Sequence, residues 1–404
     1  MRDKALWVII AIITILIIAL IVIAIIFIVR DAGKNNKNCK NGNVNYLMIE
    51  NSSCCSSDDC PASLNYSCVS PPVYAPNQCG NSTNPQCPPT PLCFSKLQTL
   101  AASGVTGNNS NFGESLAISS SWLFIGQTTG TNSNVFIFAF DTTTGQYTYS
   151  STLTLAGITP LISLSDTYMS VATNSSGVGA LHEYSYDGTS WNLLSTTSFT
   201  NPIVSISQYK SSVAIVSNFV AYVYSGGILT AEFGGMNAVS IAMDGDLVKD
   251  YLIIGSLGAA YAFSKLIAST NWGDIRRSYV GDNIQFGSNV SIDAPKFAIS
   301  DYFNSQLLVY NVCHIDSPAA IINALGDPTS SIFTPGVLVT GYSNLTLYSS
   351  QNSMFDPPCF FPGYEWDYDG GGPIKSAVGG VNAAVKYNST VLGIAIDIFV
   401  KSTP

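Results

Sequence analysis

Three aspartates in one short stretch have the residue types of a candidate calcium site. The sequence MDGDLVKD places Asp244, Asp246 and Asp250 between two expected strands, where a loop can turn several carboxylate oxygens toward one cation. Their spacing departs from the order that acidic calcium loops prefer, so a solvated turn is the alternative interpretation. Calcium is the one cofactor candidate that the sequence offers.

The two histidines are the candidates for a catalytic base. His182 lies beside Glu183 in an expected strand, and His314 follows Cys313. Neither belongs to a G-x-S-x-G, phosphate-loop or H-E-x-x-H motif, so a structural role is the simpler interpretation for both. Hydrolysis by paired carboxylates stays open, because the fold decides whether two carboxylates approach each other. The sequence therefore predicts a protein that is not an enzyme.

Eight of the ten cysteines are concentrated in a segment rich in Pro, Asn and Ser. An even number of cysteines at this density is typical of a disulfide framework in an oxidising compartment. Zinc is the alternative, but the segment has no C-x-x-C pair and no histidine. The remaining two cysteines are expected to pair with each other. The predicted disulfide cysteines are Cys39, Cys54, Cys55, Cys60, Cys68, Cys79, Cys87, Cys93, Cys313 and Cys359.

Glycosylation sequons also occur along the chain. Because Asn, Ser and Thr are frequent in this sequence, some N-x-S/T triplets arise by chance, and they support a glycoprotein only weakly. The candidate acceptors are Asn51, Asn65, Asn81, Asn108, Asn174, Asn289, Asn344 and Asn388.

An uncharged apolar run near the N-terminus is long enough to cross a membrane. Residues 6–29 contain no charge and no proline, and 24 helical residues rise roughly 36 Å against a hydrocarbon core of ~30 Å. A long signal peptide and a buried core helix are the alternatives, but no convincing cleavage site follows the run. The run predicts an uncleaved signal anchor.

The orientation of this anchor follows from the cysteines rather than from the flanking charges. More basic residues follow the run than precede it, which alone would place the C-terminal part in the cytosol. Large C-terminal domains translocate largely regardless of flanking charge, so the disulfide argument carries more weight. We therefore expect a single-pass type II membrane protein. Its expected parts are a cytosolic tail at 1–5, the anchor at 6–29, a disulfide-stapled stalk at 30–93 and a head at 94–404.

The overall charge excludes one class of partner. The formal net charge is -9, only 10% of residues are charged, and no cluster of Lys and Arg is present. Phosphate backbones are bound by such clusters, so the sequence predicts no nucleic-acid partner.

The region beyond the stalk repeats one strand pattern. Each unit begins with a short apolar strand, continues with a second strand after a tight turn, and in five units has an aromatic-rich third strand. Repeats of about 40–50 residues with four short strands are typical of propeller blades, because radial packing buries both faces of every sheet. A β-sandwich is the alternative. The expected first strands begin at Glu114, Pro160, Pro202, Asn237, Ser288 and Pro335, and the sixth unit is degenerate.

The C-terminal tail predicts a seventh unit that lacks one strand. Its three expected strands lie near Val381, from Thr390 (TVLGIAI) and from Asp397 (DIFVK). Residues 94–100 precede the first unit and resemble the other fourth strands, so we expect them to complete the last sheet and close the ring. The predicted fold class is all-β: a seven-bladed β-propeller with an N-terminal transmembrane helix and a disulfide-rich stalk.

The first unit carries a family resemblance. NFGESLAISSSWLFIGQTTG, from Asn111, resembles the FG-GAP repeat of integrin α-subunit heads, and Phe-Gly recurs at Phe233-Gly234 and Phe286-Gly287. The match departs from the family where Gly126-Gln127 and Gly255-Ser256 replace its "GAP" half. The resemblance implies seven blades and a binding or adhesive role rather than a reaction.

The order of anchor, stalk and propeller resembles viral neuraminidases and attachment glycoproteins. Sialidase chemistry needs three arginines around a substrate carboxylate, and the region beyond the stalk has only Arg276 and Arg277. Side chains of adjacent strand residues point to opposite faces, so even these two do not share a pocket easily. The sequence therefore excludes a sialidase.

These observations predict a surface glycoprotein whose head mediates adhesion or receptor attachment. The expected partners are the lipid bilayer, a protein or glycan ligand on another surface, and a second copy through the stalk. The expected location is a virion membrane or a cell surface, with the C-terminal domain outside. The alternatives are a membrane-anchored scaffold protein of a virus particle and a carbohydrate-active propeller enzyme.

Overall fold

The computed structural model describes residues 73–74, 94–105, 111–273, 277–281, 283–312, 318, 320–323, 329–333, 336–340, 344–350, 360–367, 375–379, 382–389 and 392–401. The predicted anchor at 6–29 and all ten cysteines lie outside these residues. Among the described residues, no helix has the length and apolar character that crossing a membrane requires. The predicted anchor and disulfides therefore stay predictions.

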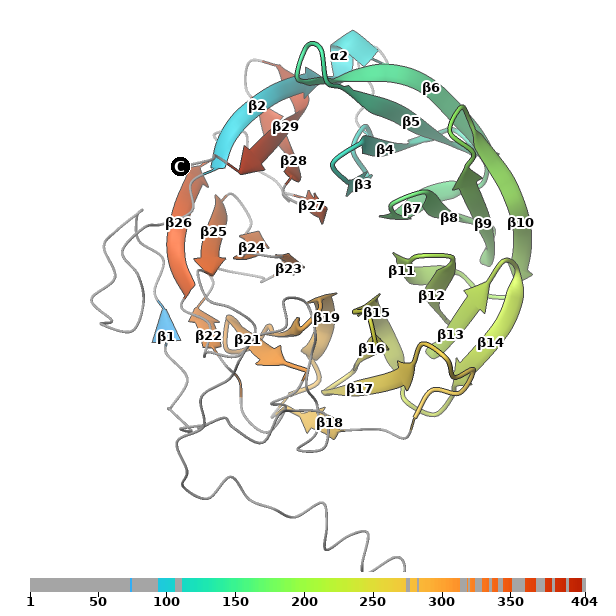
Figure 1. The fold of residues 1–404 in the computed structure, drawn as a ribbon, viewed down its shortest axis with the longest axis vertical. Coiled ribbons are helices and arrows are strands. Elements are labelled where there is room, and N and C mark those ends of the chain that lie inside the picture. The colour runs from blue at the N-terminus through green and yellow to red at the C-terminus, as the bar shows by residue number, and fades with distance from the viewer. Residues whose placement is uncertain are drawn as a thin grey trace, which may run out of the picture. The chain divides into compact units, whose positions relative to one another are not determined.

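The described strands form seven sheets that follow one another around a common axis (Figure 1). Four strands of each sheet form an antiparallel meander, and the strands nearest the axis are β3, β7, β11, β15, β19, β23 and β27. The all-β propeller that the repeat pattern predicts is thus observed.

The first four sheets each contain four consecutive strands. Sheet 1 is β3 (Ser115–Ile118), β4 (Trp122–Thr129), β5 (Asn132–Asp141) and β6 (Gln146–Ala156). Sheet 2 is β7 (Ile158–Ser165), β8 (Tyr168–Ser175), β9 (Val178–Tyr186) and β10 (Trp191–Phe199). Sheet 3 is β11 (Ile203–Tyr209), β12 (Ser212–Ser217), β13 (Val220–Ser225) and β14 (Ile228–Phe233). Sheet 4 is β15 (Ala238–Gly245), β16 (Lys249–Ser256), β17 (Ala259–Leu266) and β18 (Arg277–Val280).

The last three sheets include two strands from the N-terminal side. Sheet 5 is β19 (Phe286–Asp293), β20 (Lys296–Asp301), β21 (Gln306–Asn311) and β22 (Ala320–Asn323), with β1 (Val73–Tyr74) parallel to β22. Sheet 6 is β23 (Thr329–Phe333), β24 (Gly336–Thr340), β25 (Asn344–Ser350) and β26 (Phe360–Asp367). Sheet 7 is β27 (Lys375–Gly379), β28 (Asn382–Ser389), β29 (Gly393–Lys401) and β2 (Phe94–Ala101), and the short helix α2 (Ala102–Val105) follows β2.

The hydrophobic cores lie between neighbouring sheets. Phe124 and Ile137 of sheet 1 pack against Val171 and Tyr184 of sheet 2 in one buried cluster. Equivalent clusters lie between sheets 2 and 3, 3 and 4, and 4 and 5. Because both faces of a sheet are covered, a central strand such as β4 is buried over five consecutive residues instead of alternating. This packing explains the continuous apolar runs of the repeat.

Sheet 7 closes the ring through a strand from the other end of the propeller sequence. β2 pairs antiparallel with β29, from Phe94 opposite Lys401 to Ala101 opposite Ala395, as the sequence predicts for residues 94–100. The hydroxyl of Thr99 donates a hydrogen bond of 2.6 Å to the buried carboxylate of Asp397. The ring is therefore held shut by a backbone ladder and by a buried side-chain bond.

Hydroxyl groups near the axis link neighbouring sheets. The backbone N–H of Gln208 in β11 donates to Ser163 Oγ of β7 at 2.8 Å, and the N–H of Met243 in β15 donates to Ser207 Oγ of β11 at 2.9 Å. Ser115 in β3 accepts in the same way from Ile162 in β7 at 2.9 Å. Serine in the innermost strands thus satisfies backbone donors that no neighbouring strand can reach.

The Phe-Gly pairs have a structural explanation at two of their three positions. Phe112 is fully buried between sheets 7 and 1, and Gly113 has a φ of 75°. Phe286 is likewise buried, and Gly287 has a φ of 78°. Phe233 instead lies half-buried against Phe263 and Trp272, and its glycine has no positive φ. The pair therefore marks a buried ring followed by a left-handed turn in only part of the repeats.

Two strand predictions were wrong, and one short segment of the predicted stalk pairs with the propeller. The strand expected to start at Pro335 is the second strand of sheet 6, because β23 precedes it with a weakly apolar sequence, TSSIF. In sheet 7 the residues near Val381 lie between β27 and β28, and the two strands expected from Thr390 and Asp397 are the single strand β29. Val73 and Tyr74, which the sequence assigns to the stalk, add a strand to the outer edge of sheet 5.

Candidate binding surface

The two sides of the propeller differ in which connections they carry. Within each sheet, successive strands are antiparallel, so the connections alternate between the two sides. One side carries the turns between first and second strands and between third and fourth strands. The other side carries the turns between second and third strands and the loops that lead into the next sheet. Exposed apolar side chains occur on both sides, for example Ile228, Leu247 and Leu266 on the first, whereas the described charged turns are concentrated on the first side.

The second of these sides carries a group of exposed apolar side chains on sheets 4 and 5. Val280 is 78% exposed, Ile284 74%, Phe303 72% and Leu257 52%. We call these four residues the apolar cluster and the side that bears them the apolar face. Leu257 lies in the β16–β17 turn, Val280 ends β18, Ile284 lies in the loop before β19, and Phe303 lies in the β20–β21 turn. Large exposed apolar groups at neighbouring loops are typical of interaction sites.

Hydrogen bonds hold the loops of the apolar cluster together. The N–H of Gly281, next to Val280, donates to the carbonyl of Gly258, next to Leu257, at 3.1 Å. The N–H of Gly258 in turn donates to the carbonyl of Phe286 at 3.1 Å. The side-chain amide of Asn283, next to Ile284, donates to Asp301 at 3.3 Å. These bonds join loops of two sheets into one surface.

More exposed apolar residues continue the apolar face over sheets 2 and 3. Val178, Val204 and Phe219 each expose about half of their surface near the ends of strands on this side. The carbonyl of Phe219 accepts from the N–H of Ala238 at 2.9 Å, which joins sheets 3 and 4. The apolar face therefore extends beyond the cluster along the rim of the propeller.

Few charged residues occur in the described turns and loops of the apolar face. Among the described residues of its turns and loops Glu114 is charged, and Asp301 and Asp367 end the adjoining strands β20 and β26. Glu114 accepts a hydrogen bond of 2.6 Å from Thr128, and Asp301 accepts one of 2.7 Å from Asn304. Carboxylates that already have protein donors lose less on burial than free ones do. This side can be covered by another apolar surface at low electrostatic cost.

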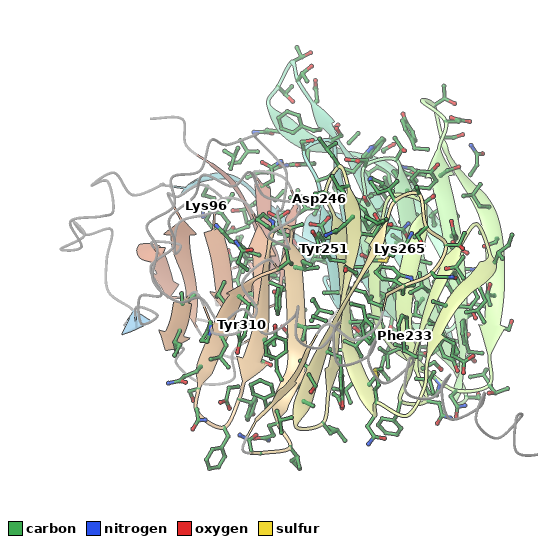
Figure 2. The ribbon with its side chains drawn as sticks, turned by 60° about the horizontal axis from the view of Figure 1, so that its bottom comes forward. Lys96, Phe233, Asp246, Tyr251, Lys265 and Tyr310 are labelled. Atoms are coloured by element: carbon green, nitrogen blue, oxygen red, sulfur yellow. The ribbon has the colours of Figure 1, made fainter. Side chains whose placement is uncertain are left out.

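The opposite side, which we call the charged face, carries most of the charged turns. The turns of sheets 1 to 5 on this side place aspartates and lysines at strand ends: Asp141, Asp166, Asp187, Lys210, Asp244, Asp246, Asp293 and Lys296. In Figure 2, Asp246, Tyr251 and Lys265 lie toward one end of the strands and Phe233 lies toward the other. Titratable groups are thus segregated from the apolar cluster.

The predicted calcium residues lie on the charged face but do not converge. Asp246 accepts from the N–H groups of Val248 and Lys249 at 2.7 and 2.8 Å, and Asp250 forms an ion pair of 2.7 Å with Lys265. Asp244 accepts from the N–H of Ala294 at 2.6 Å. Among the described residues, no group of three His, Cys, Asp or Glu side chains could hold a metal ion. Each of the three carboxylates is held by a different protein donor.

The structure pairs Asp244 instead with a residue that the sequence did not single out. Burial and the negative charge of Asp293 raise the pKa of Asp244 to about 7, and the N–H of Ala294 and the nearby Lys210 oppose the rise. Burial lowers the pKa of Lys296 to about 8, against the attraction of Asp293. Asp293 is the last residue of β19 and Asp244 the last but one of β15, so both lie beside an equivalent turn of the repeat. That equivalence is the signal that could have linked them.

The remaining predicted residues are placed without forming a reactive group. His182 lies 3.2 Å from the hydroxyl of Thr196 in the neighbouring strand, and burial lowers its pKa. Asn174 is held by Ile203, whose N–H donates to its Oδ1 at 2.8 Å and whose carbonyl accepts from its Nδ2 at 3.0 Å. Asn289 lies in β19, Asn344 in β25, Asn388 in β28 and Arg277 in β18. Asn51, Asn65, Asn81, Asn108, Arg276 and His314 lie outside the described residues.

The described part of the chain is a β-propeller. It resembles the WD40 domain of coronin from Toxoplasma gondii with a TM-score of 0.52 and 10% identity, over 78% of this chain and 88% of that chain. Sqt1 from Saccharomyces cerevisiae matches with a TM-score of 0.48 and 9% identity, over 78% of this chain and 100% of that chain. The Dos1 propeller matches with a TM-score of 0.48 and 11% identity, over 76% of this chain and 95% of that chain.

Comparisons by sequence add nothing to this fold assignment. The chain matches no family model. The search of curated proteins also finds no match. The FG-GAP resemblance thus gains no support, and the similarity to solved propellers establishes the fold alone.

Proposed function

We propose that this chain is a binding protein whose propeller head contacts a protein partner through the apolar face. The apolar cluster carries the proposal, because four largely exposed side chains are held in one place by hydrogen bonds between two sheets. The buried centre of a protein interface is more apolar than its rim, and a few well-packed side chains there contribute most of the affinity. A glycan partner fits less well, since sugars require many polar groups at the contact.

The direction of the chain supports an exposed apolar face. β2 begins at Phe94 on the charged side and runs toward the apolar side, because it is antiparallel to β29. The polypeptide therefore enters the propeller on the charged side. We infer an anchor at residues 6–29 and a disulfide-stapled stalk at 30–93 before this strand. We infer a type II protein with a head of seven blades, either in a virion membrane or on a cell surface.

A pair of charge insertions tests the proposed surface. Full-length protein in labelled lipid vesicles is applied to cell monolayers, and bound vesicles are counted by fluorescence. Ile284→Asp is expected to reduce binding on the order of tenfold, because the new carboxylate must lose water in the interface. Leu247→Asp is the matched control, since Leu247 is 77% exposed on the charged face. Equal loss in both variants, or loss in the control alone, would contradict the proposal.

The anchor and its orientation have separate tests. The chain is expected to stay with membranes after alkaline carbonate extraction, and deletion of residues 6–29 is expected to release it. Protease added outside intact vesicles from expressing cells should reach the head only if the orientation is inverted. Non-reducing gel mobility of the same sample reports whether the predicted disulfides have formed.

A second candidate function follows from the carboxyl groups of the charged face. A carboxyl with a pKa near neutrality beside a second carboxylate is the arrangement that glycoside hydrolases use for a general acid. The candidate residues are Asp244 and Asp293. Activity on a glycan panel that is lost in Asp244→Asn would favour a carbohydrate-active enzyme, and no activity favours binding alone. A scaffold role in a particle would leave both the glycan and the cell-binding assays negative.

A further inference from the structure

We propose that the outer edge of sheet 5 is a strand-accepting site, and that its resident occupant is β1 of the same chain, which clamps the N-terminal part of the chain to the propeller. β1 runs parallel to β22, with Val73 opposite Ile321 and Tyr74 opposite Ile322 (Figure 1). This site lies at the periphery of the propeller, and it is independent of the apolar face and of the proposed function.

The outer edge of sheet 5 differs from the outer edges of the other described sheets. In β6, β10, β14, β26 and β2 the ladder to the third strand skips one residue, which is a bulge in the outer strand. The skipped residues are Ser150, Leu194, Thr230, Gly363 and Leu97. β18 and β22 pair without a shift, but β18 begins with the charged Arg277. Bulges and charges keep an edge from pairing with another strand, and β22, with the sequence AIIN, has neither.

The backbone of β22 is therefore the edge of this propeller best suited to receive a strand. Ala320 and Ile322 are both 0% exposed, so the strand is held firmly in the sheet. A regular, uncharged edge presents a row of N–H and C=O groups to any extended chain. Because main-chain hydrogen bonds supply the affinity in strand addition, the occupant needs above all to be extended. β1 meets this need at β22 and also lies next to β26 of sheet 6.

The sequence around β1 explains why this strand is extended and short. In PPVYAP, residues 71–76, Pro72 directly precedes Val73 and Pro76 follows Tyr74 by two positions. Proline fixes its own φ at about −65° and disfavours the helical region for the residue before it, so the segment is biased toward an extended backbone. Proline also lacks an N–H, so it cannot donate to a ladder. β1 thus replaces a regular edge by a short one that a further strand can hardly use.

The connection to β2 favours β1 of the same chain over that of a second copy. Residues 75–93 link β1 to β2, and a chain of this length reaches at most roughly 60 Å, while only sheet 6 lies between sheets 5 and 7. A tether of this kind gives β1 an effective concentration on the order of 1 mM at the edge, which a second copy in a dilute suspension does not reach. Because β1 is parallel to β22, it also starts on the charged side, where β2 starts.

Photo-cross-linking of the full-length protein tests the clamp directly. Tyr74 is replaced by p-benzoylphenylalanine, the protein is irradiated in lipid vesicles, and the attachment site is identified by mass spectrometry. Attachment to sheet 5 or to β26 is expected, in a product that has the mass of one chain on a reducing denaturing gel. A product with twice that mass would assign the occupant to a second copy and would overturn the proposal. Attachment elsewhere in the chain, or no product, would place β1 away from this edge and would overturn it as well.

Backbone exchange tests the same contact without an added group. Val73→Pro together with Tyr74→Pro removes both N–H donors of β1, and hydrogen–deuterium exchange of β22 is expected to become on the order of tenfold faster. Asn77→Pro together with Gln78→Pro is the matched control, because it puts two prolines outside β1, and β22 should exchange as in wild type. Unchanged exchange of β22 in the first variant, or equal acceleration in the control, would contradict the clamp.

The amides of β4 and β8 report whether the propeller itself stays folded. They should exchange equally in wild type and in both variants, because β1 does not pair with either strand. If they exchange faster in the Val73→Pro and Tyr74→Pro variant, that variant is misfolded, and the cross-link on the native backbone decides between the outcomes given above.

Discussion

The charged face and the apolar face of the propeller are built from the same repeat and both expose apolar side chains, but they differ in the number of charged groups that their described turns carry. On the charged face, short turns between first and second strands hold Asp244, Asp246 and Asp293, and each carboxylate is near backbone donors or other charges. On the apolar face, the turns between second and third strands hold Leu257 and Phe303 exposed to solvent. Packing between the strands does not determine the residue type in either set of turns. The comparison therefore indicates that the apolar residues have a use outside the fold, whereas the charged ones are engaged within it.

Removing the closing strand should have the largest effect, because it affects both faces at once. Deletion of residues 94–100 leaves β29 without its outer partner and removes the bond from Thr99 to Asp397. We expect the head to lose cooperative folding, as judged by circular dichroism on heating. Thr99→Val keeps the ladder and should cost only about 1–2 kcal/mol. A deletion variant with unchanged thermal stability would contradict the closed ring.

A substitution at Gly287 tests how rigidly the apolar face is connected. Gly287 has a φ of 78°, and a Cβ there would collide with the carbonyl oxygen of Ala259 in sheet 4. Gly287→Ala is expected to lower the free energy of unfolding by roughly 3 kcal/mol. Gly130→Ala is the control on the same face, with a φ of 60° and no atom within 4 Å of the added carbon. It should cost about 1 kcal/mol, measured by chemical denaturation. Equal costs would mean that the loops adjust freely.

The charged face should be the pH-dependent one. The pKa of Asp244 rises from 3.8 to about 7 on folding, so its protonated form stabilises the fold below pH 4, and this contribution is lost as the pH rises through 7. Asp244→Asn cannot ionise, and Asn can still accept the N–H of Ala294. We expect Asp244→Asn to exceed wild type in stability by roughly 4 kcal/mol at pH 7.5 and to equal it at pH 4.

Below pH 7.5 the titration of Asp244 can be measured separately from that of Lys296. Lys296, whose pKa is lowered to about 8, changes the stability above that range, because burying its charged form is unfavourable until it loses its proton. Asp293 and Lys210 are the other charged groups near Asp244. Parallel pH curves for wild type and Asp244→Asn would contradict the assignment, and Ile284→Asp should not change the wild-type curve.

The sequence predicted the propeller because its signals are local. Apolar runs, aromatic third strands and tight turns recur in every unit from sheet 1 to sheet 5, and the pairing of residues 94–100 with the tail follows from a missing strand. The prediction failed where a strand has little pattern, as in β23 with TSSIF. It also failed in β29, where Asp397 suggested a strand start although its carboxylate is buried in the middle of the strand.

The candidate surface could not be predicted, because it depends on contacts between sheets. Leu257, Val280 and Ile284 are ordinary apolar residues in the sequence, and only the bonds between the loops of sheets 4 and 5 show that they lie together in solvent. The three aspartates near residue 244 misled for the same reason. Closeness in sequence suggested one site, but Asp250 faces Lys265 and Asp244 faces β19.

Side-chain footprinting of the tethered protein tests the central claim most directly. Full-length protein is labelled with a photoactivated carbene while vesicles are free and again while they are bound to their target surface, and modification is read by mass spectrometry. We predict that Ile284 and Phe303 become protected on binding while Leu247 keeps its free-state labelling. Protection of Leu247 with unchanged labelling of Ile284 and Phe303 would contradict the assignment of binding to the apolar face.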